Sequence, residues 1–261
     1  MRINSKDVIK IVKQVSAEEL LSRYTTVCTQ YKDDGSIVTE ADLAMQNRLK
    51  AELLGLYPDT VLLSEEMPVT EQQNALNSEQ AVWCLDPLDG TSNYAAGIPY
   101  FAVSLSLIDQ GNIIMGLVYD PVRDECFFAE HNSSAMLNGD EIILNDTNEN
   151  INNAIAIIDL KRLHTDLSTR LVKEQPFASQ RNFGASALDW CWLAVNRGQI
   201  YLHGKQNIWD YSAGQYIFNK AGGCSCTLEG EPVFSNKLEG RSIVAAVNTA
   251  LLDNWLAWIN N

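Results

Sequence analysis

Two aspartates that lie three residues apart give the strongest sign of chemistry in this sequence. They stand in the stretch Trp83-Cys84-Leu85-Asp86-Pro87-Leu88-Asp89-Gly90-Thr91. Its apolar beginning suits a buried strand, and both carboxylates follow where that strand ends. Proline fixes φ and lacks an N–H, so we expect the chain to leave the sheet at Pro87. Taken alone, the pattern favours a turn with two capping aspartates over a metal site.

Further carboxylates elsewhere in the chain shift this balance. Glu65 and Glu66 follow the apolar run 61–64, and Asp210 follows Trp209 near the expected start of a helix. Carboxylates gathered in one place repel each other, and some stay protonated unless cations lie between them. Mg²⁺ takes oxygen ligands, keeps several waters and shares the oxygens of a phosphate. The acidic residues therefore favour a site where hard divalent cations hold a phosphate ester.

The order and spacing of these motifs resemble those of the inositol monophosphatase family. That family carries a strand ending in Glu-Glu, then D-P-[IL]-D-G-T, and then W-D-x-x-A-G. The matching segments here are Glu65-Glu66, residues 86–91 and residues 209–214, in the same order. The segment from Lys32 to Asp42, with Val-Thr at positions 38 and 39, is similar to the family's K…V-T-x-x-D pattern. The resemblance covers nearly the whole chain and implies a Mg²⁺-dependent phosphatase of small phosphorylated metabolites.

The resemblance also implies how two or three Mg²⁺ ions would be bound. Glu65, Asp86 and the backbone carbonyl of Leu88 would bind the first ion. Asp86, Asp89 and Asp210 would bind the second, and a weaker third ion would lie near Glu65 through waters. Two such ions can stabilise both the attacking and the leaving oxygen of an in-line displacement.

Other matched residues would act on the water and on the phosphate. The nucleophile implied by the resemblance is a metal-bound water that Thr91 and Asp42 orient or deprotonate. The N–H groups of Gly90 and Thr91 would point at the phosphate from the start of a helix. Lys32 would lie in a loop that closes over the metals, and Glu66 would stand outside the direct ligands.

Several of these residues have a purely structural alternative. Thr39 and Asp42 could do no more than cap the helix that we expect over residues 40–56. Asp210 could be a favourable charge at a helix N-terminus, and Lys32 could be a solvated surface charge.

The substrate side departs from the family pattern. A later segment resembles the one that contacts the alcohol part of the substrate, and it gives Gly184, Ala185 and Ser186 as contacts. Inositol-specific members carry a glutamate six residues before the tryptophan of W-D, where this chain has His203. A neutral histidine can bond a hydroxyl, a protonated one favours an anion, and Lys205 adds charge nearby. We expect a substrate other than, or broader than, inositol phosphate, unless His203 is a strand-end residue without a ligand.

The same metal motifs serve more than one reaction. A nucleotidase acting on 3′-phosphoadenosine 5′-phosphate, or a fructose-1,6-bisphosphatase-like activity, remains open as an alternative on the same scaffold. A haloacid dehalogenase phosphatase is excluded because that class uses D-x-D, whereas two residues separate Asp86 from Asp89. A non-catalytic binding protein with this fold is the alternative from another class, and the intact carboxylates argue against it.

The amino-acid composition limits which partners the protein could bind and which compartment it could occupy. The chain has 261 residues and a formal net charge of −14, which repels nucleic acid and anionic membranes. It would also repel a phosphorylated substrate unless cations lie between them. Six cysteines without a C-x-x-C pair, and no apolar signal near Met1, indicate a cytoplasmic protein with reduced thiols. The resemblance further implies a homodimer that lithium inhibits.

Alternating strand and helix patterns indicate an α/β fold, and the resemblance implies a layered αβαβα sandwich of the inositol monophosphatase and fructose-1,6-bisphosphatase type. Helical spacing predicts a helix capped by Ser5 that runs to about Arg23. A second helix should follow Thr39, and residues 101–119 should form a hairpin around Gln110-Gly111-Asn112.

A polar, asparagine-rich connection over residues 138–153 suggests two parts of one compact unit. Residues 1–146 would form an α+β half with most of the metal ligands. Residues 147–261 would form an α/β half with Asp210 and the substrate-side residues, in which strands and helices alternate.

Overall fold

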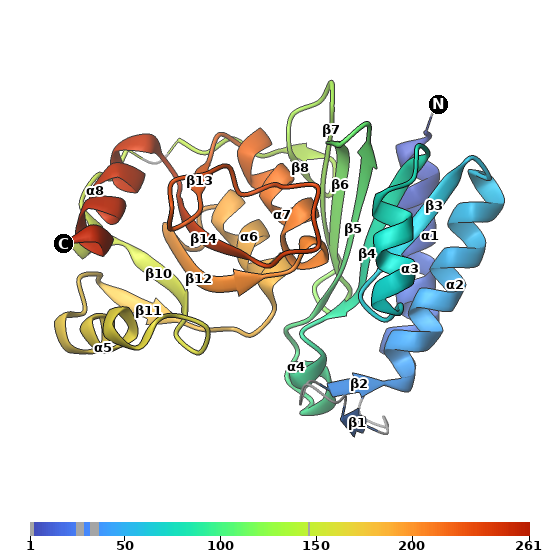
Figure 1. Cartoon of the computed structure of the whole chain (residues 1–261), viewed down its shortest axis with the longest axis horizontal. Helices are drawn as coiled ribbons and strands as arrows, with labels where there is room; N and C mark the ends of the chain where they lie inside the picture. The colour runs from blue at the N-terminus through green and yellow to red at the C-terminus, as the bar shows by residue number, and fades with distance from the viewer. Residues whose placement is uncertain (1–2, 25–28, 32–36, 146) are drawn as a thin grey trace.

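The structure is a computed structural model that describes residues 3–24, 29–31, 37–145 and 147–261. Two large β-sheets alternate with helices in five layers: helices, sheet, helices, sheet and helices (Figure 1). The layering confirms the predicted αβαβα sandwich. Each sheet buries both faces, so the strands between the layers are rich in apolar residues.

The first sheet has seven strands in the order β3-β4-β5-β6-β7-β8-β9. β3 and β4 are parallel, and every later neighbour is antiparallel, so the predicted hairpin over residues 101–119 is confirmed as β5 and β6. The strands are Thr60–Ser64, Ala81–Asp89, Ala102–Asp109, Asn112–Asp120, Glu125–Glu130, Met136–Leu137 and Asp140–Glu141.

Helices cover the outer face of this sheet. They are α1 (Ser5–Val15), which continues as the π-helix η1 (Ser16–Leu21), and α2 (Glu40–Leu56). The short α3 (Val69–Leu76) instead packs its Ala75 and Leu76 into the core on the other face of the sheet. Val8 and Met45 pack with Trp83 of β4 in one apolar core, whereas Cys84 faces the other core. The cap predicted at Ser5 is wrong by one residue, because Asn4 accepts the hydrogen bond from Lys6 N.

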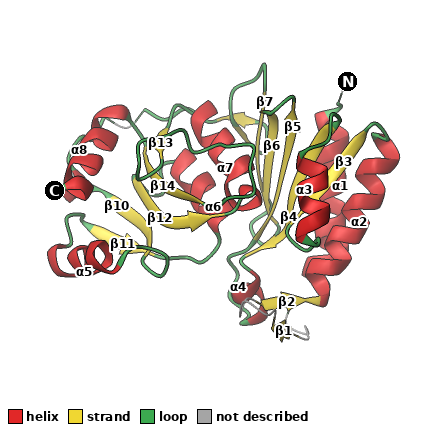
Figure 2. Ribbon diagram, in the orientation of Figure 1, coloured by secondary structure: helices red, strands yellow, loops and turns green. Residues whose placement is uncertain are grey.

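Two helices fill the space between the sheets: α6 (Ser186–Ala194) and α7 (Ile208–Lys220) (Figure 2). Small residues allow their close approach, since a Cβ on Gly214 would lie 2.7 Å from Trp190 Cβ. On the sheet side, a Cβ on Gly116 would lie 2.8 Å from Ala213 O. The small pair Ala213-Gly214 therefore lets α7 pack against the sheet and α6 at once, which fixes the start of α7.

The second sheet has five strands in the order β11-β10-β12-β14-β13. β10 is parallel to both of its neighbours, and β14 is antiparallel to β12 and β13. The strands β10 to β14 are Ile155–Asp159, Ser179–Arg181, Ile200–Gln206, Cys224–Cys226 and Arg241–Ala246. Helices α5 (Thr165–Glu174) and α8 (Thr249–Asn260) lie on its outer side (Figure 1).

Short elements complete the chain: β1 (Thr29–Tyr31) pairs with β2 (Ile37–Thr39), and α4 (Thr91–Ala95) and the 3₁₀ helix η2 (Ile151–Asn153) are single turns. One apolar core contains Val118 of the first sheet and Ile157 of the second. The boundary near residue 146 stays a prediction. Among the described helices, none combines the length and apolar character needed to cross a membrane.

Candidate active site

A β-bulge at the end of β4 brings the first two aspartates together. β4 pairs with β5 up to Asp86 opposite Ser104, and again at Asp89 opposite Ala102. The prediction that the chain leaves the sheet at Pro87 is wrong, because Pro87 lies in the extra length of this bulge. Residues three apart on a regular strand face opposite sides of the sheet. The bulge changes this alternation, so Asp86 and Asp89 line the same cavity.

The cavity has a volume of about 550 Å³ and gathers acidic residues from three places in the chain. Glu65 follows β3, Asp86 and Asp89 end β4, and Asp210 lies in the first turn of α7. β3 and β4 are parallel neighbours, so their carboxyl ends meet at one edge of the sheet. The structure thus brings together four side chains that the sequence spreads over residues 65–210.

Backbone N–H groups hold three of these carboxylates in place. Asp89 accepts bonds from Ser186 N (3.1 Å) and Ala187 N (2.7 Å) at the start of α6. Asp210 accepts from Asn207 N (2.8 Å) and Asp86 from Leu88 N (3.0 Å). The charge on Asp89 also suits the positive end of the α6 dipole.

Burial outweighs these hydrogen bonds in the protonation of the cluster. Burial first, and then the charges of Glu65 and the other aspartates, raise the pKa of Asp86 and Asp210 well above the usual range. For Asp89, burial raises the pKa to about 7, although the N–H groups of Ala187 and Ser186 act in the opposite direction. Without a counter-charge, the cavity would therefore hold protons on carboxylates that are ordinarily ionised.

The donor chemistry of this cavity fits hard divalent cations. Carboxylate oxygens, together with the carbonyl of Leu88 on the cavity wall, are ligands that Mg²⁺ and Ca²⁺ prefer. Divalent cations would also supply the counter-charge that these buried, mutually repelling carboxylates lack. Within the described residues, no three His, Cys, Asp or Glu side chains stand in a finished metal-binding arrangement.

Asp42 is joined to the cavity through Thr91. Its Oδ2 accepts from Thr39 N (2.8 Å) and Thr39 Oγ1 (2.5 Å), which confirms the predicted cap of α2. Its Oδ1 lies 3.2 Å from Thr91 Oγ1, and Thr91 lines the cavity. Burial, and next the charge of Glu65, raise the pKa of Asp42. Asp42 therefore has both roles: its Oδ2 caps α2, and its Oδ1 contacts Thr91 at the cavity.

Gly90 fits the cavity wall as only glycine can. Its φ is +89°, and a Cβ there would lie 3.0 Å from both Ala185 Cβ and Tyr100 O. Gly90 precedes Thr91, the first residue of α4. The backbone of the Asp-Gly-Thr segment therefore passes directly beside the loop that carries Ala185.

The predicted substrate-side residues line the same cavity. Gly184, Ala185, Ser186 and His203 are all on its wall. Asn93 Nδ2 steadies this loop by donating to Phe183 O at 2.7 Å. Glu66 follows Glu65 but does not line the cavity, and Lys32 lies outside the described residues.

The sequence interpretation missed several polar residues of the wall. Asp159 ends β10, and Asp189 lies within α6, where Tyr100 donates its hydroxyl to it at 3.0 Å. The others are Ser92, Lys161, Arg162, Asn182 and Asn207. One signal could have found Asp159, since polar residues directly after a buried parallel strand often face a binding crevice.

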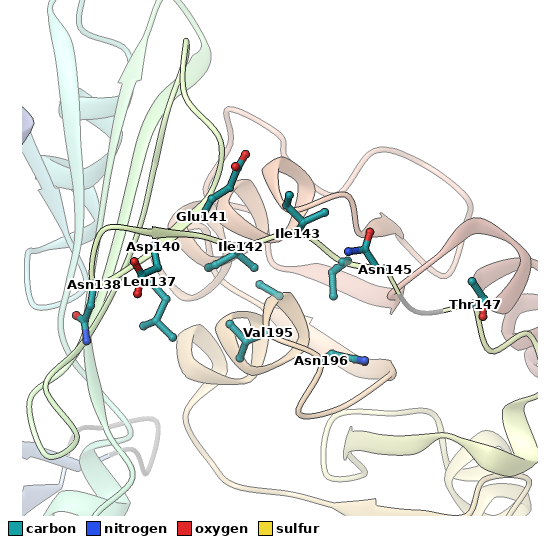
Figure 3. Close-up of a pocket in the computed structure, with 12 residues that line it drawn as sticks. Leu137, Asn138, Asp140, Glu141, Ile142, Ile143, Asn145, Thr147, Val195 and Asn196 are labelled. Atoms are coloured by element: carbon teal, nitrogen blue, oxygen red, sulfur yellow. The ribbon is translucent and has the colours of Figure 1, made fainter.

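A larger cavity, of about 810 Å³, lies elsewhere and lacks this chemistry (Figure 3). It is lined by residues 137, 138, 140–145 and 147, which run from the end of β8 through β9 and beyond, and by residues 194–196 at the end of α6. Asp140 and Glu141 are exposed there. Because the buried carboxylates with raised pKa lie in the smaller cavity, we assign the candidate active site to that one.

Comparison with known proteins gives the family. A model of the inositol monophosphatase family matches residues 4–258. The chain belongs to the inositol monophosphatase family. A relative from Aquifex aeolicus, named fructose-1,6-bisphosphatase/inositol-1-monophosphatase, is 33% identical over 227 residues, which are 85% of this chain and 81% of the relative. The Nus factor SuhB of Haemophilus influenzae is 30% identical over 215 residues, 80% of this chain and 77% of the relative.

Solved structures agree with this assignment. The crystal structure of the extragenic suppressor protein suhB from Bartonella henselae matches with a TM-score of 0.85 at 25% identity, and the match covers 98% of both chains. The family is one of phosphatases, so the resemblance inferred from the acidic motifs is confirmed. The names of these inositol monophosphatase family members refer to different activities, so they do not identify one substrate.

Proposed function

We propose that this protein hydrolyses a phosphate monoester of a small metabolite with the help of two or three Mg²⁺ ions. The ligands would be Glu65, Asp86, the carbonyl of Leu88, Asp89 and Asp210. The observation that carries the proposal is the presence of four acidic side chains on one cavity wall, where burial raises the pKa of Asp86, Asp89 and Asp210. Such a wall attracts divalent cations, which then hold a phosphate that the net charge of −14 would otherwise repel.

The side chains around this centre would divide the work of hydrolysis. When bound, the divalent cations would polarise the phosphate and make a water easier to deprotonate, so that the water oxygen attacks phosphorus, the bond to the ester oxygen breaks and the alcohol leaves after taking up a proton. Thr91 Oγ1 orients the attacking water, and Asp42 accepts the proton through the 3.2 Å contact between Thr91 Oγ1 and Asp42 Oδ1. The N–H groups of Gly90 and Thr91 contact the phosphate at the start of α4.

The alcohol part of the substrate would lie against Gly184, Ala185, Ser186 and His203. A bisphosphate or a nucleotide phosphate is the second candidate substrate. The observation in its favour is that Lys161, Arg162 and Lys205 also line the cavity, where they would attract another anionic group.

Phosphate release from a panel of metabolites, with Mg²⁺ and with a chelator, tests the proposal. We expect release from at least one small phosphate ester in Mg²⁺ and none after chelation. Inositol 1-phosphate, fructose 1,6-bisphosphate and 3′-phosphoadenosine 5′-phosphate in one panel rank the candidate substrates. A purified, folded protein that binds Mg²⁺ but releases no phosphate from any ester would favour the non-catalytic alternative.

Other expectations from the family resemblance belong to the same proposal. They are inhibition by lithium, a homodimer, a cytoplasmic location, no nucleic-acid or membrane partner, a Lys32 loop that closes over the metals, and Glu66 outside the direct ligands. Each stays a prediction, and the same phosphate-release assay with added lithium tests the first.

A further inference from the structure

Two acidic side chains of the cavity wall stand outside the set that would bind metals: Asp159 and Asp189. They differ in environment. Asp189 is buried, accepts the hydroxyl of Tyr100, and has a pKa raised well above its usual range, chiefly by burial. The side chain of Asp159 is 21% exposed, and the hydrogen bond from His203 lowers its pKa. Asp159 is therefore an ionised acceptor at the cavity surface.

His203 holds Asp159 and is fully engaged in doing so. The two residues are opposite each other on the parallel strands β10 and β12, with His203 Nε2 3.1 Å from Asp159 Oδ2. The backbone N–H of Lys205 donates to His203 Nδ1 at 3.2 Å. This pattern assigns the ring proton to Nε2, so both nitrogens have partners within the protein. The ring is also only 7% exposed, so it can border the alcohol part of a substrate but has no free nitrogen to bond a hydroxyl.

Asp159, in contrast, keeps capacity for another partner. Its Oδ1 accepts from Lys161 N at 2.8 Å, and its Oδ2 accepts from His203. Each carboxylate oxygen can accept more than one hydrogen bond, so both retain room for a further donor. Since both present partners are donors, an amide in this place would bring two donors face to face. The position therefore calls for a carboxylate.

The backbone around Asp159 is fixed as closely as its side chain. A Cβ on Gly204 of β12 would overlap the carbonyl oxygen of Arg162. The loop after β10 therefore lies directly on β12 and cannot move inward. Asp159 is thus anchored by its own strand, by His203, by Lys161 N and by this contact.

We propose that Asp159 determines specificity by accepting a hydrogen bond from a hydroxyl of the substrate's alcohol part, with His203 as the residue that positions it. An ionised carboxylate repels a phosphate and gains little from an apolar group, whereas a hydroxyl donor satisfies it. The substrate class is then a phosphorylated polyol or sugar. This inference rests on the proposed function, because the phosphate would lie at the four-carboxylate end of the cavity.

A comparison of two esters tests the inference in the full chain. For wild type and Asp159→Asn, kcat/KM is measured with Mg²⁺ for inositol 1-phosphate and for phenyl phosphate, which has no further hydroxyl. We expect the ratio of the two kcat/KM values to fall by roughly ten- to a hundredfold in Asp159→Asn. His203→Phe should lower the same ratio mainly through KM for the polyol ester. Equal losses on both esters would overturn the proposal.

The exposed pair of His164 and Asp166 provides the matched control. These side chains lie 3.5 Å apart and are 80% and 93% exposed, so Asp166→Asn makes the same chemical change away from the cavity. It should leave the ratio at its wild-type value.

Binding of free inositol without metal, followed by ligand-observed NMR, separates this inference from the proposed function. A wild type that cleaves no ester of the metabolite panel would refute the phosphatase activity, and weaker inositol binding by Asp159→Asn would still support the hydroxyl contact. Indistinguishable binding by wild type and Asp159→Asn would overturn it.

Discussion

Asp89 shows how opposing effects are balanced in a single side chain of this site. Two backbone N–H groups at the start of α6 stabilise its charged form, and yet burial and the nearby Glu65 raise its pKa to about 7. A carboxyl group with a pKa near neutral pH loses its proton readily when a cation binds beside it. Asp89 is therefore suited to give up a proton on metal binding rather than to remain a fixed charge.

Removing a carboxylate from the cluster should abolish activity without unfolding the protein. We expect Asp89→Asn and Asp210→Asn each to lower Mg²⁺-dependent kcat/KM by at least about a hundredfold, because a ligand and a compensating charge are lost. Without metal, the melting temperature of Asp210→Asn should stay level at neutral pH, because the amide resembles the protonated carboxyl that burial favours there. Asp89→Asn should melt somewhat lower, because its amide nitrogen would face a backbone N–H of Ser186 or Ala187. Phosphate release and Mg²⁺ titration calorimetry measure both effects. Asp253→Asn on the exposed side of α8 is the control, and full activity in either cavity variant would contradict the assignment.

Thr91 tests the role of a single hydroxyl. Thr91→Val keeps the shape but removes the contact to Asp42 Oδ1, so kcat should fall by roughly 10²–10⁴-fold, as for loss of a general acid–base partner. Thr91→Ser retains the hydroxyl and should recover most of the rate. Thr70→Val on the exposed surface of α3 makes the same change as a control. A Val variant as active as the Ser variant would mean that the hydroxyl takes no part.

At the scale of elements, α7 sets the position of Asp210, and glycine sets the position of α7. Gly214→Ala would bring its Cβ to 2.7 Å from Trp190 Cβ and 3.0 Å from Ala187 O. We expect a loss of about 1–3 kcal/mol in the free energy of unfolding from this overpacking. Activity should fall too, because α7 carries Asp210 and α6 carries the N–H groups that hold Asp89.

Gly55 in α2 gives a matched comparison, since a Cβ there meets nothing within 4 Å. Gly55→Ala should stabilise the protein by roughly 0.5–1 kcal/mol through helix propensity alone. Urea unfolding of both variants measures the difference. If Gly214→Ala were also stabilising, the close packing of α6 and α7 would not constrain this helix.

The sequence predicted helices and strands well where the residues within one helix or hairpin are enough to determine it. Thr39 caps α2 as expected, and the hairpin of β5 and β6 turns at Gln110-Gly111. Ser5 and Asn4 are both good caps, and only the geometry of the first turn decides for Asn4. The bulge at Pro87 depends on pairing with β5, which no pattern within β4 reveals.

The residues of the candidate site also fall into those that a local motif predicts and those that depend on a distant partner. Glu65, Asp86, Asp89 and Asp210 were found because each lies in a recognisable motif at the end of a strand or the start of a helix. Asp159 was missed because its role depends on contact with His203, which follows 44 residues later on the neighbouring strand. A partner across a sheet is fixed by register, and the register becomes visible only in the folded chain.

At the scale of the whole molecule, the acidic charge and the acidic cavity act together. A net charge of −14 attracts divalent cations and repels phosphate esters. The cavity then concentrates four of these charges in one place. Cation binding is therefore expected to contribute to stability as well as to chemistry.

The pH dependence of stability should reveal this coupling. The pKa of Asp89 is raised from an ordinary value near 3.9 to about 7, and those of Asp86 and Asp210 are raised as well. The folded state then binds more protons than the unfolded state between about pH 4 and pH 7. Without metal, the stability from these groups is fully present below about pH 4 and is lost as pH rises toward 7.

Mg²⁺ should reverse this loss, since it takes the place of the protons. At 100 times its dissociation constant it adds about 2.7 kcal/mol, or about 5–10 °C in melting temperature, at pH 8. At pH 5 the shift should be much smaller, because protons compete for the same oxygens. Calorimetric melting with MgCl₂, and with NaCl at equal ionic strength, measures both values. Asp210→Asn should lose most of the pH 8 shift, and an equal shift at both pH values, or with NaCl, would show that the carboxylates do not bind the cation.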